Sequence, residues 1–447
     1  MLSAPLPLLA SAAPDAPLVW RKGRPVSRAV FLGDVFRVAR RLPTARFLLN
    51  LCEDRYLFMV AFAAAGLNGQ TSLLPSSRAN LHLQHLSAAY PDSARISDPD
   101  LTPILEADPV VSAECAIPEL PGGHVMAIAF TSGSTGHAKP NPKSWGELVS
   151  SAWQARQRFG FAAGMAIVAT VPPQHMYGLE TSIMTALASG ASVHGGRPFF
   201  PEDVRAALAA VPAPRVLVTT PIHLQTCVRA GLRWPSVAFL ISATAPLAPA
   251  LAADAETTFG APVLEIYGFT EAGSIASRRT LDGDRWRLYA GFQLRDGRLS
   301  GAHLPEPVPL NDLVEVCGER EFRLLGRSED LVNIAGKRHS LAALGHEINQ
   351  IAGVVEGVFV LPDDRGADVR RLMALVVAPA LSERQVLAAL AERIDPVFLP
   401  RPLLKVDALP RNDTGKITRE ALLALIDASR CSTIARPSDP NPPNHES

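Results

Sequence analysis

Short apolar runs recur along the chain, separated by segments long enough to form helices. The runs lie at residues 125–130, 166–171, 215–219, 237–241 and 262–266. Short apolar runs of this length are typical of buried strands. A strand that returns parallel to its neighbour needs a crossover connection, usually a helix. The sequence therefore predicts an α/β fold with a parallel sheet, and residues 28–66 continue the pattern with helix, strand and helix.

The rest of the chain differs in composition. Residues 74–124 are rich in Pro, Ser and Asp and are expected to form loops with short helices. A Gly-rich, charged stretch with short strands follows Glu265. Beyond Gly326 we predict a smaller α+β domain with a helix at 341–351, strands at 354–361 and 369–378, and a helix that begins after Ser382, which has capping-box spacing to Gln385.

The length allows more than one domain. A chain of 447 residues is expected to form two to three domains at roughly 150 residues each. We predict a large domain at 1–328, a small domain at 329–430 and a disordered, proline-rich tail at 431–447.

Balanced charge limits the kinds of partner. The chain has 43 basic and 43 acidic residues, so no global field favours nucleic acid or an anionic membrane. The longest apolar stretch, Tyr56 to Leu67, is shorter than the roughly 20 residues that span a bilayer. The first residues lack the basic segment of a secretory signal. Five scattered cysteines show neither disulfide nor zinc spacing. We expect a cytoplasmic protein with no nucleic-acid partner and no membrane span.

One loop has the composition of a phosphate-binding site. The strand at 125–130 leads into Thr131-Ser-Gly-Ser-Thr-Gly136, and Lys139 follows. Small residues let backbone N–H groups approach a phosphate, the hydroxyls add donors, and the lysine adds positive charge. The loop lacks the Lys-Ser/Thr pair of a Walker A motif, and the next helix is expected to start late, at Ser144 with its capping partner Glu147. By itself, the segment could also be a flexible turn.

Further segments extend this pattern along the chain. They are Pro172-Pro-Gln-His-Met-Tyr-Gly-Leu179, Ser242-Ala-Thr-Ala-Pro-Leu247, Tyr267-Gly-Phe-Thr-Glu271, Leu310-Asn-Asp312, Gly326-Arg-Ser-Glu-Asp-Leu-Val-Asn-Ile-Ala-Gly-Lys-Arg338 and Pro410-Arg-Asn-Asp-Thr-Gly-Lys-Ile-Thr-Arg419. Together with the loop, they resemble in order and spacing the motifs of the adenylate-forming superfamily, which includes acyl-CoA and aryl-CoA synthetases, peptide-synthetase adenylation domains and luciferases. Ala138 replaces the usual proline of the loop, and Ala243 and Thr244 replace usual glycines.

The resemblance implies a fold and a set of site residues. The fold is a large, multi-subdomain N-terminal α/β domain with a smaller, mobile C-terminal α+β domain, here with a shortened N-terminal region. Binding of the nucleotide and thiol is implied for Thr131, Ser132, Gly133, Ser134, Thr135, Gly136, Lys139, Thr244, Ala245, Pro246, Tyr267, Gly268, Thr270, Asp312, Arg327 and Gly336.

The resemblance also implies residues closer to the chemistry. Glu271 helps to hold Mg²⁺, His175 walls the acid pocket, and Lys416 contacts the substrate carboxylate and AMP. Glu329 is the hinge about which the small domain turns. Taken alone, His175 could be an ordinary turn histidine, Lys416 a surface lysine and Gly336 a turn glycine.

Lysine is rare in this chain. Only six of the 43 basic residues are lysines. Lys139, Lys337 and Lys416 lie inside the motifs, whereas we assign no role to Lys22, Lys143 and Lys405. Because arginine is the common cation here, retained Lys139 and Lys416 indicate a need for a compact, flexible ammonium group.

The implied activity is an ATP- and Mg²⁺-dependent ligase. It forms an acyl or aryl adenylate, releases pyrophosphate, and transfers the acyl group to CoA or to the phosphopantetheine of an acyl carrier protein. We expect an aromatic or medium-sized carboxylic acid. The alternatives are a member of the same fold that stops at the adenylate and one that serves as a binding module without catalysis.

Overall fold

The computed structural model describes residues 4–10, 12–75, 77–107, 116–132, 138–310, 312–327, 331–334, 337–362, 372–411 and 417–434. The chain forms two compact units. One comprises Met1–Leu310 and Glu315–Arg323, and the other comprises Asn311–Val314 and Leu324–Ser447. The division of the chain at residues 328 and 430 stays a prediction. Within the described ranges, no helix is both long and apolar enough to cross a membrane.

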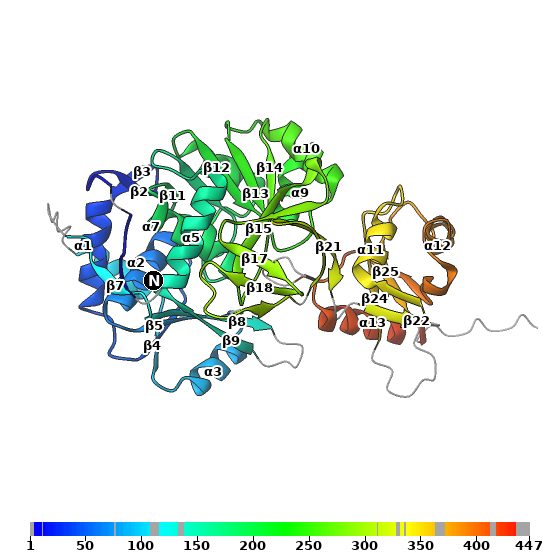
Figure 1. Ribbon diagram of the computed structural model, residues 1–447, viewed down its shortest axis with the longest axis horizontal. Helices are drawn as coiled ribbons and strands as arrows, with labels where there is room; N and C mark the ends of the chain where they lie inside the picture. Colours follow the sequence, from blue (N-terminus) through cyan, green and yellow to red (C-terminus); the bar gives the residue numbers. More distant parts are fainter. Residues whose placement is uncertain are drawn as a thin grey trace, which may run out of the picture. The chain divides into compact units, whose positions relative to one another are not determined.

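An eleven-stranded sheet is the largest in the described chain (Figure 1). Its parallel centre consists, in spatial order, of β14 (Val263–Phe269), β13 (Phe239–Ser242), β12 (Arg215–Thr219), β10 (Ala166–Ala169) and β11 (Ser192–His194). One flank continues through β15 (Gly273–Arg279), β16 (Arg285–Leu288), β21 (Glu321–Arg327) and β20 (Asp312–Gly318), and the other through β2 (Pro17–Arg21) and β3 (Arg24–Ser27). Four of the five predicted runs form strands here, which confirms the expected α/β class.

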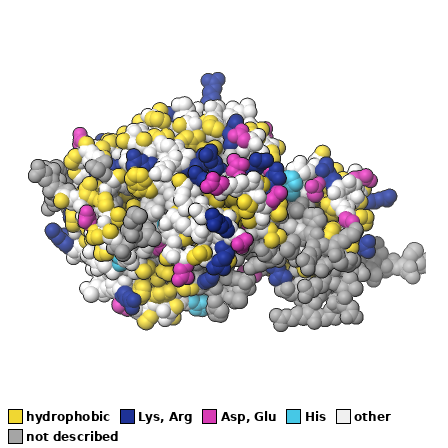
Figure 2. Space-filling view, in the orientation of Figure 1, with side chains coloured by type: hydrophobic (Ala, Val, Ile, Leu, Met, Phe, Trp, Pro, Cys, Tyr) yellow, Lys and Arg dark blue, Asp and Glu magenta, His cyan; other side chains and the backbone are white. Residues whose placement is uncertain are grey.

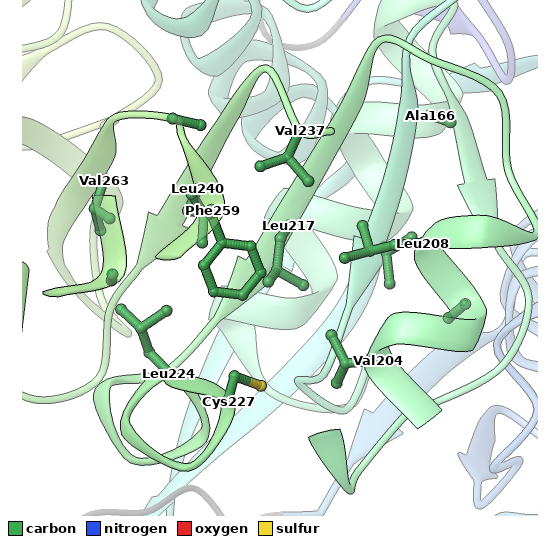
Figure 3. Close-up of a cluster of buried hydrophobic side chains, with 14 of the residues drawn as sticks. Ala166, Val204, Leu208, Leu217, Leu224, Cys227, Val237, Leu240, Phe259 and Val263 are labelled. Carbon is green, nitrogen blue, oxygen red and sulfur yellow. The ribbon is translucent and has the colours of Figure 1, made fainter. Parts of the chain in front are cut away.

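Helices bury the apolar side chains of this sheet. The helices α8 (Pro201–Ala209), α9 (Pro221–Arg229) and α10 (Pro249–Phe259) contribute to one hydrophobic cluster. Figure 3 shows the ring of Phe259 close to Leu217 of β12 and Leu240 of β13, with Leu224 and Cys227 of α9 beside them. The apolar runs become strands because these helices remove both strands and helix faces from water.

A second, five-stranded sheet carries the loop at 131–139. Its order in the described chain is β6 (Ser93–Ile96), β4 (Phe47–Asn50), β5 (Thr71–Leu74), β8 (Val125–Ser132) and β9 (Ala138–Ser144). The helices α1 (Arg28–Ala39), α2 (Arg55–Leu67), α3 (Asn80–Ala89) and α4 (Asp98–Glu106) belong to the same part of the chain. The predicted helix, strand and helix of residues 28–66 are therefore confirmed as α1, β4 and α2.

Two expectations for this region are wrong, and the strand β9 was not predicted. The run at 125–130 is a strand, but it joins the second sheet, because an apolar pattern does not specify the strand's partner. Residues 138–144 form β9, antiparallel to β8, although Pro140 and Pro142 disfavour strands. Proline is tolerated at a sheet edge, and β9 is an edge strand. Residues 74–124 also contribute the regular strand β6.

Smaller sheets complete the described parts of the first unit. They comprise β1 (Pro5–Pro7) with β7 (Glu119–Pro121), and β17 (Phe292–Arg295) with β18 (Arg298–Gly301) and β19 (Val308–Pro309). The predicted late start of the helix after the loop is confirmed, since Ser144 caps α5 (Trp145–Phe159) in a capping box with Glu147. On the face shown in Figure 2, side chains of both charges are interspersed with hydrophobic ones.

The second unit contains the four predicted α+β elements, which are α11 (Leu341–Asn349), β24 (Glu356–Val360), β25 (Met373–Val377) and α12 (Glu383–Ala391) capped by Ser382. It also contains elements that were not predicted, which are β26 (Leu403–Lys405), α13 (Arg419–Ile434) and β22 (Leu331–Ile334) paired to β23 (Lys337–Ser340). The helix α13 continues four residues into the segment expected to be a disordered tail, because the first proline of that segment comes only at Pro437. The remainder of that tail lies outside the described residues.

Candidate active site

The sequence motifs of the first unit converge on one edge of the large sheet. The strands β10, β12, β13 and β14 are neighbours and parallel. Their carboxyl ends therefore lie at the same edge, where ligands bind in open α/β sheets. The segment with His175 follows β10, the segment with Thr244 follows β13, and Glu271 follows β14. Topology thus gathers three motifs that are far apart in the sequence.

The Tyr267–Glu271 motif forms one end of a hairpin. The strand β14 pairs with β15 antiparallel, with an irregularity at Tyr267 and Gly268. A Cβ atom on Gly268 would lie 2.2 Å from the carbonyl oxygen of Gly273, so glycine is required for this close approach. The ring centroid of Tyr267 lies 5.6 Å from that of Trp286 and 5.8 Å from that of Phe322. Thr270 and Glu271 are left in the turn beyond the strands.

Two lysines of β9 reach Glu271. The ammonium nitrogen of Lys139 lies 3.6 Å from the Glu271 carboxylate, and the Lys139 side chain is 67% exposed. Lys143 donates a hydrogen bond of 2.5 Å to the main-chain carbonyl oxygen of Glu271. The structure therefore brings together Lys139 and Glu271, which sequence motifs predicted separately, and adds Lys143, which they did not predict.

A buried polar network lies behind this turn. Glu180, in the π-helix η1 (Leu179–Met184), accepts hydrogen bonds from the hydroxyl of Ser151 at 2.6 Å and from the hydroxyl and main-chain N–H of Ser274 at 2.7 and 3.1 Å. Its carboxylate occupies the space that a Cβ atom on Gly273 would need, 2.3 Å away. The sequence signal for Glu180 was a single acidic residue within an apolar segment, which is too weak to indicate a site.

A small pocket adjoins the network. Its lining includes Lys143, Met176, Glu180 and His303, together with Glu147, Leu148, Ser151, Ala272 and Gly273. Met176 follows His175 in the chain and Ala272 follows Glu271, so the pocket connects the two motifs. Burial lowers the pKa of Lys143, whereas Glu147, Glu180 and Glu271 raise it. Burial also lowers the pKa of His303.

The His175 segment is held by close backbone contacts. His175 precedes the short helix α6 (Met176–Gly178). A Cβ atom on Gly178 would lie 2.0 Å from the carbonyl oxygen of Pro172. The hydroxyl of Tyr177 donates to the carbonyl oxygens of Thr219 at 2.9 Å and Ile241 at 3.0 Å. The segment is thereby fixed to the carboxyl ends of β12 and β13.

The Ser242–Leu247 segment follows β13. Thr244 has a φ of 81°, in the left-handed region that favours glycine. The main-chain N–H of Leu247 donates to the buried carboxylate of Glu265 at 2.9 Å. Arg278 and Thr280 also donate to this carboxylate. Thr244, Ala245 and Pro246 therefore lie in a turn anchored at its far end by Glu265.

Other predicted residues are only partly described. Thr131 and Ser132 end β8, in register with Lys139 and Ala138, but their side chains are outside the described part. Asp312 begins β20 and Arg327 ends β21, and the side chain of Arg327 is likewise not described. Gly133, Ser134, Thr135, Gly136, Glu329, Gly336 and Lys416 lie outside the described residues. Their roles stay predictions.

The donor groups at Glu271 fit a nucleotide phosphate with Mg²⁺. Mg²⁺ takes oxygen ligands, commonly one or two carboxylates together with substrate phosphates. Glu271 offers a carboxylate that is 30% exposed, with the Lys139 cation beside it. In the described ranges no group of three or more His, Cys, Asp or Glu side chains could hold a metal. Glu271 therefore suits a metal whose other ligands come from a nucleotide and water.

Known proteins resemble this chain in both sequence and fold. A 4-coumarate–CoA ligase from Rhodobacter capsulatus is 29% identical over 65% of this chain and 74% of its own length. A 2-succinylbenzoate–CoA ligase from Staphylococcus epidermidis is 23% identical over 66% of this chain and 69% of its own length. The structure of ATP-bound MatB from Rhodopseudomonas palustris is 20% identical, covers 93% of this chain and 97% of its own, and has a TM-score of 0.78.

The family model described as AMP-binding enzyme matches residues 40–299. This range contains the loop at 131–139, the His175 segment, the Thr244 segment and the Tyr267–Glu271 hairpin. The match confirms the relationship predicted from those motifs. This chain belongs to the AMP-binding enzyme family.

Proposed function

We propose that this chain is an ATP- and Mg²⁺-dependent ligase that joins a carboxylic acid to a thiol through an acyl adenylate. The observation that carries this proposal is the 3.6 Å pairing of Lys139 with the Glu271 carboxylate at the carboxyl edge of the sheet. A cation for phosphate and a carboxylate for Mg²⁺ stand side by side there. Membership of the AMP-binding enzyme family and the CoA ligases among the relatives support the same activity.

The proposed reaction has two steps, formation of the acyl adenylate and transfer of the acyl group to the thiol. A carboxylate oxygen of the acid attacks the α-phosphorus of ATP, the bond to the leaving pyrophosphate breaks, and an acyl adenylate forms. The thiol sulfur then attacks the acyl carbon, loses its proton, and displaces AMP. Negative charge develops on the phosphates in the first step, so preorganised cations lower its barrier. Lys139 supplies such a charge, and Mg²⁺ held by Glu271 would supply another.

Several further roles belong to this proposal. The main chain of Thr131–Gly136 would bind phosphate, and Lys416 would bring the carboxylate and ATP together, which raises their effective concentration. His175 would wall the acid site rather than act as a base, because the acid is already ionised at neutral pH. Nucleotide and pantetheine contacts are proposed for Tyr267, Gly268, Thr270, the Thr244–Pro246 turn, Asp312, Arg327 and Gly336, with Glu329 as the hinge.

We also propose an aromatic or medium-sized acid as the substrate. The named relatives act on 4-coumarate and 2-succinylbenzoate, both of which contain an aromatic ring. The acceptor is CoA in the first instance, as the names of these relatives indicate. The phosphopantetheine of an acyl carrier protein presents the same thiol chemistry and is the second acceptor to test.

The test is ATP–pyrophosphate exchange over a panel of aromatic, fatty and amino acids, followed by the best acid with CoA and with a carrier protein. We expect exchange with aromatic acids and thioester formation with CoA. The Lys416→Ala variant should lose at least about 100-fold in adenylation and retain thioester formation from supplied acyl adenylate. Absence of exchange with every acid would instead indicate a binding module, and preference for an amino acid would contradict the substrate class.

A further inference from the structure

Lys143 is a buried lysine to which the sequence motifs assign no role. It lies on β9, four residues after Lys139, and is 5% exposed. Burial of an ammonium group is unfavourable unless the group is hydrogen-bonded and its charge is balanced. The surroundings of Lys143 must therefore provide both.

Acidic groups that have other hydrogen bonds offset part of the cost of burying the charge of Lys143. Glu147, Glu180 and Glu271 all act on it electrostatically. The Glu147 carboxylate accepts from the main-chain N–H of Ser144 at 2.6 Å as part of the cap of α5. Glu180 is held by Ser151 and Ser274. Lys143 thus sits in an acidic environment while it directs its own hydrogen bond to the Glu271 carbonyl.

The Glu271 carbonyl lies in the turn of the hairpin, outside the paired strands. The paired residues of β14 and β15 nearest to the turn are Phe269 and Gly273, so Glu271 lies beyond the strand ladder. A residue in such a turn is positioned by the contacts of the turn itself. Lys143 provides one contact at the main chain, and Lys139 provides another at the carboxylate. The edge strand β9 therefore contacts both the main chain and the side chain of Glu271.

We propose that Lys143 is a positioning residue, whose buried ammonium fixes the main chain of Glu271 so that the carboxylate is presented to Mg²⁺ bound with the nucleotide. Lys143 does not touch substrate in this role. The inference rests on the proposed function and deepens it, because it assigns the Mg²⁺-dependent part of nucleotide binding to a residue outside the motifs. Groups that support a metal ligand typically change metal affinity by about 10- to 100-fold when they are removed.

The test is calorimetric binding of a non-hydrolysable ATP analogue to the full chain, with Mg²⁺ and with EDTA. Lys143→Met keeps the apolar stem and removes the donor and charge. We expect it to weaken binding about 10-fold or more with Mg²⁺ and to leave binding in EDTA nearly unchanged. Lys143→Arg retains the charge and a donor, so it should recover most of the Mg²⁺-dependent affinity.

Lys405→Met is the matched control. Lys405 is exposed and also donates to a main-chain carbonyl, that of Leu381, at 2.5 Å. Its replacement should change neither titration. The second comparison is a double-mutant cycle with Glu271→Gln. If Lys143 acts through Glu271, then Lys143→Met should cause no further loss in the Glu271→Gln background.

These measurements distinguish failure of the role of Lys143 from failure of the proposed function. Equal weakening with and without Mg²⁺, unchanged binding, or losses that add to those of Glu271→Gln would overturn the role of Lys143 and leave the proposed function intact. If the wild-type chain itself bound the analogue without any dependence on Mg²⁺, the proposed function would fall together with this role. If Lys143→Met fails to fold, Lys143→Gln takes its place in the same titrations and cycle.

Discussion

Thr244 holds a backbone conformation that residues with a Cβ atom seldom adopt. Its φ is 81°, and a Cβ atom in the left-handed region costs about 1–2 kcal/mol. The related motif usually has glycine here, so this chain keeps the turn but carries a threonine. Strained residues concentrate at functional sites, where the surrounding structure holds them in place. The hydrogen bond between Leu247 and Glu265 anchors the far end of this turn.

We predict that Thr244→Gly is more stable than Thr244→Ala by about 1 kcal/mol. Both variants remove the threonine hydroxyl and methyl groups, so the difference reports the cost of the Cβ atom at this φ. Chemical denaturation with a common m-value measures it. If the alanine variant proves the more stable of the two, the turn has a different backbone conformation from the one described.

The candidate site was predictable where a residue belongs to a motif and unpredictable where tertiary packing creates its role. Lys139 and Glu271 came from separate motifs, and the fold pairs them. Lys143 has no neighbouring signal in sequence, since the fold alone brings it to the pocket that Glu180, from another element, also lines. The role of Glu180 follows from its hydrogen bonds with Ser151 and Ser274. No local sequence pattern connects these three residues.

At the level of elements, side-chain hydrogen bonds fix the position of the short helix in the segment from Pro172 to Leu179. The Tyr177 hydroxyl joins the ends of β12 and β13. Buried Arg55 of α2 donates to the carbonyl oxygens of Ala169 at 3.0 Å and Val171 at 2.8 Å. These bonds tie the loop before His175 to the second helix of the chain.

Gly178→Ala should destabilise the protein by about 1–3 kcal/mol, the usual cost of overpacking, because its Cβ atom would lie 2.0 Å from the carbonyl of Pro172. It should also raise the KM for the acid, since the His175 segment must shift. Thermal unfolding and exchange kinetics measure the two effects. Gly123→Ala is the control, as a Cβ atom at Gly123 meets nothing within 4 Å. Equal stability of the two variants would refute the close contact.

The sequence patterns predicted which segments form strands better than they predicted which strands pair with one another. The runs that became β10, β12, β13 and β14 are apolar because helices bury them in a parallel sheet. The run that became β8 has the same composition but pairs with β5 and β9. The edge strand β9 escaped prediction because its prolines oppose strand formation except at an edge. Pairing is decided by the whole fold, so a local pattern cannot supply it.

At the level of the whole molecule, buried and half-buried histidines link stability to pH. Burial lowers the pKa values of His82, His194, His223 and His303 below the ordinary value of 6.5. For His223, Arg197 lowers the pKa further. In the unfolded chain these rings bind protons below about pH 6.5, whereas in the folded chain they resist protonation. Unfolding therefore takes up protons in this range.

We predict that the melting temperature falls as the pH is lowered from 7 to 5. The stabilisation is present above the unfolded pKa and is lost as the pH falls through the lowered folded pKa values. His223→Gln should reduce this dependence. Calorimetry at several pH values gives the slopes. A pH dependence that is identical in wild type and His223→Gln would remove His223 from the explanation.

In the proposed reaction, the acid is activated by attack of its own oxygen on the α-phosphorus of ATP. The most direct measurement uses an acid labelled with ¹⁸O in the carboxylate, the full chain, ATP, Mg²⁺ and CoA, with mass spectrometry of the released nucleotide. We expect AMP that carries one ¹⁸O atom, because the acyl–oxygen bond breaks when the thiol attacks. Unlabelled AMP, or label found in phosphate or pyrophosphate, would contradict it.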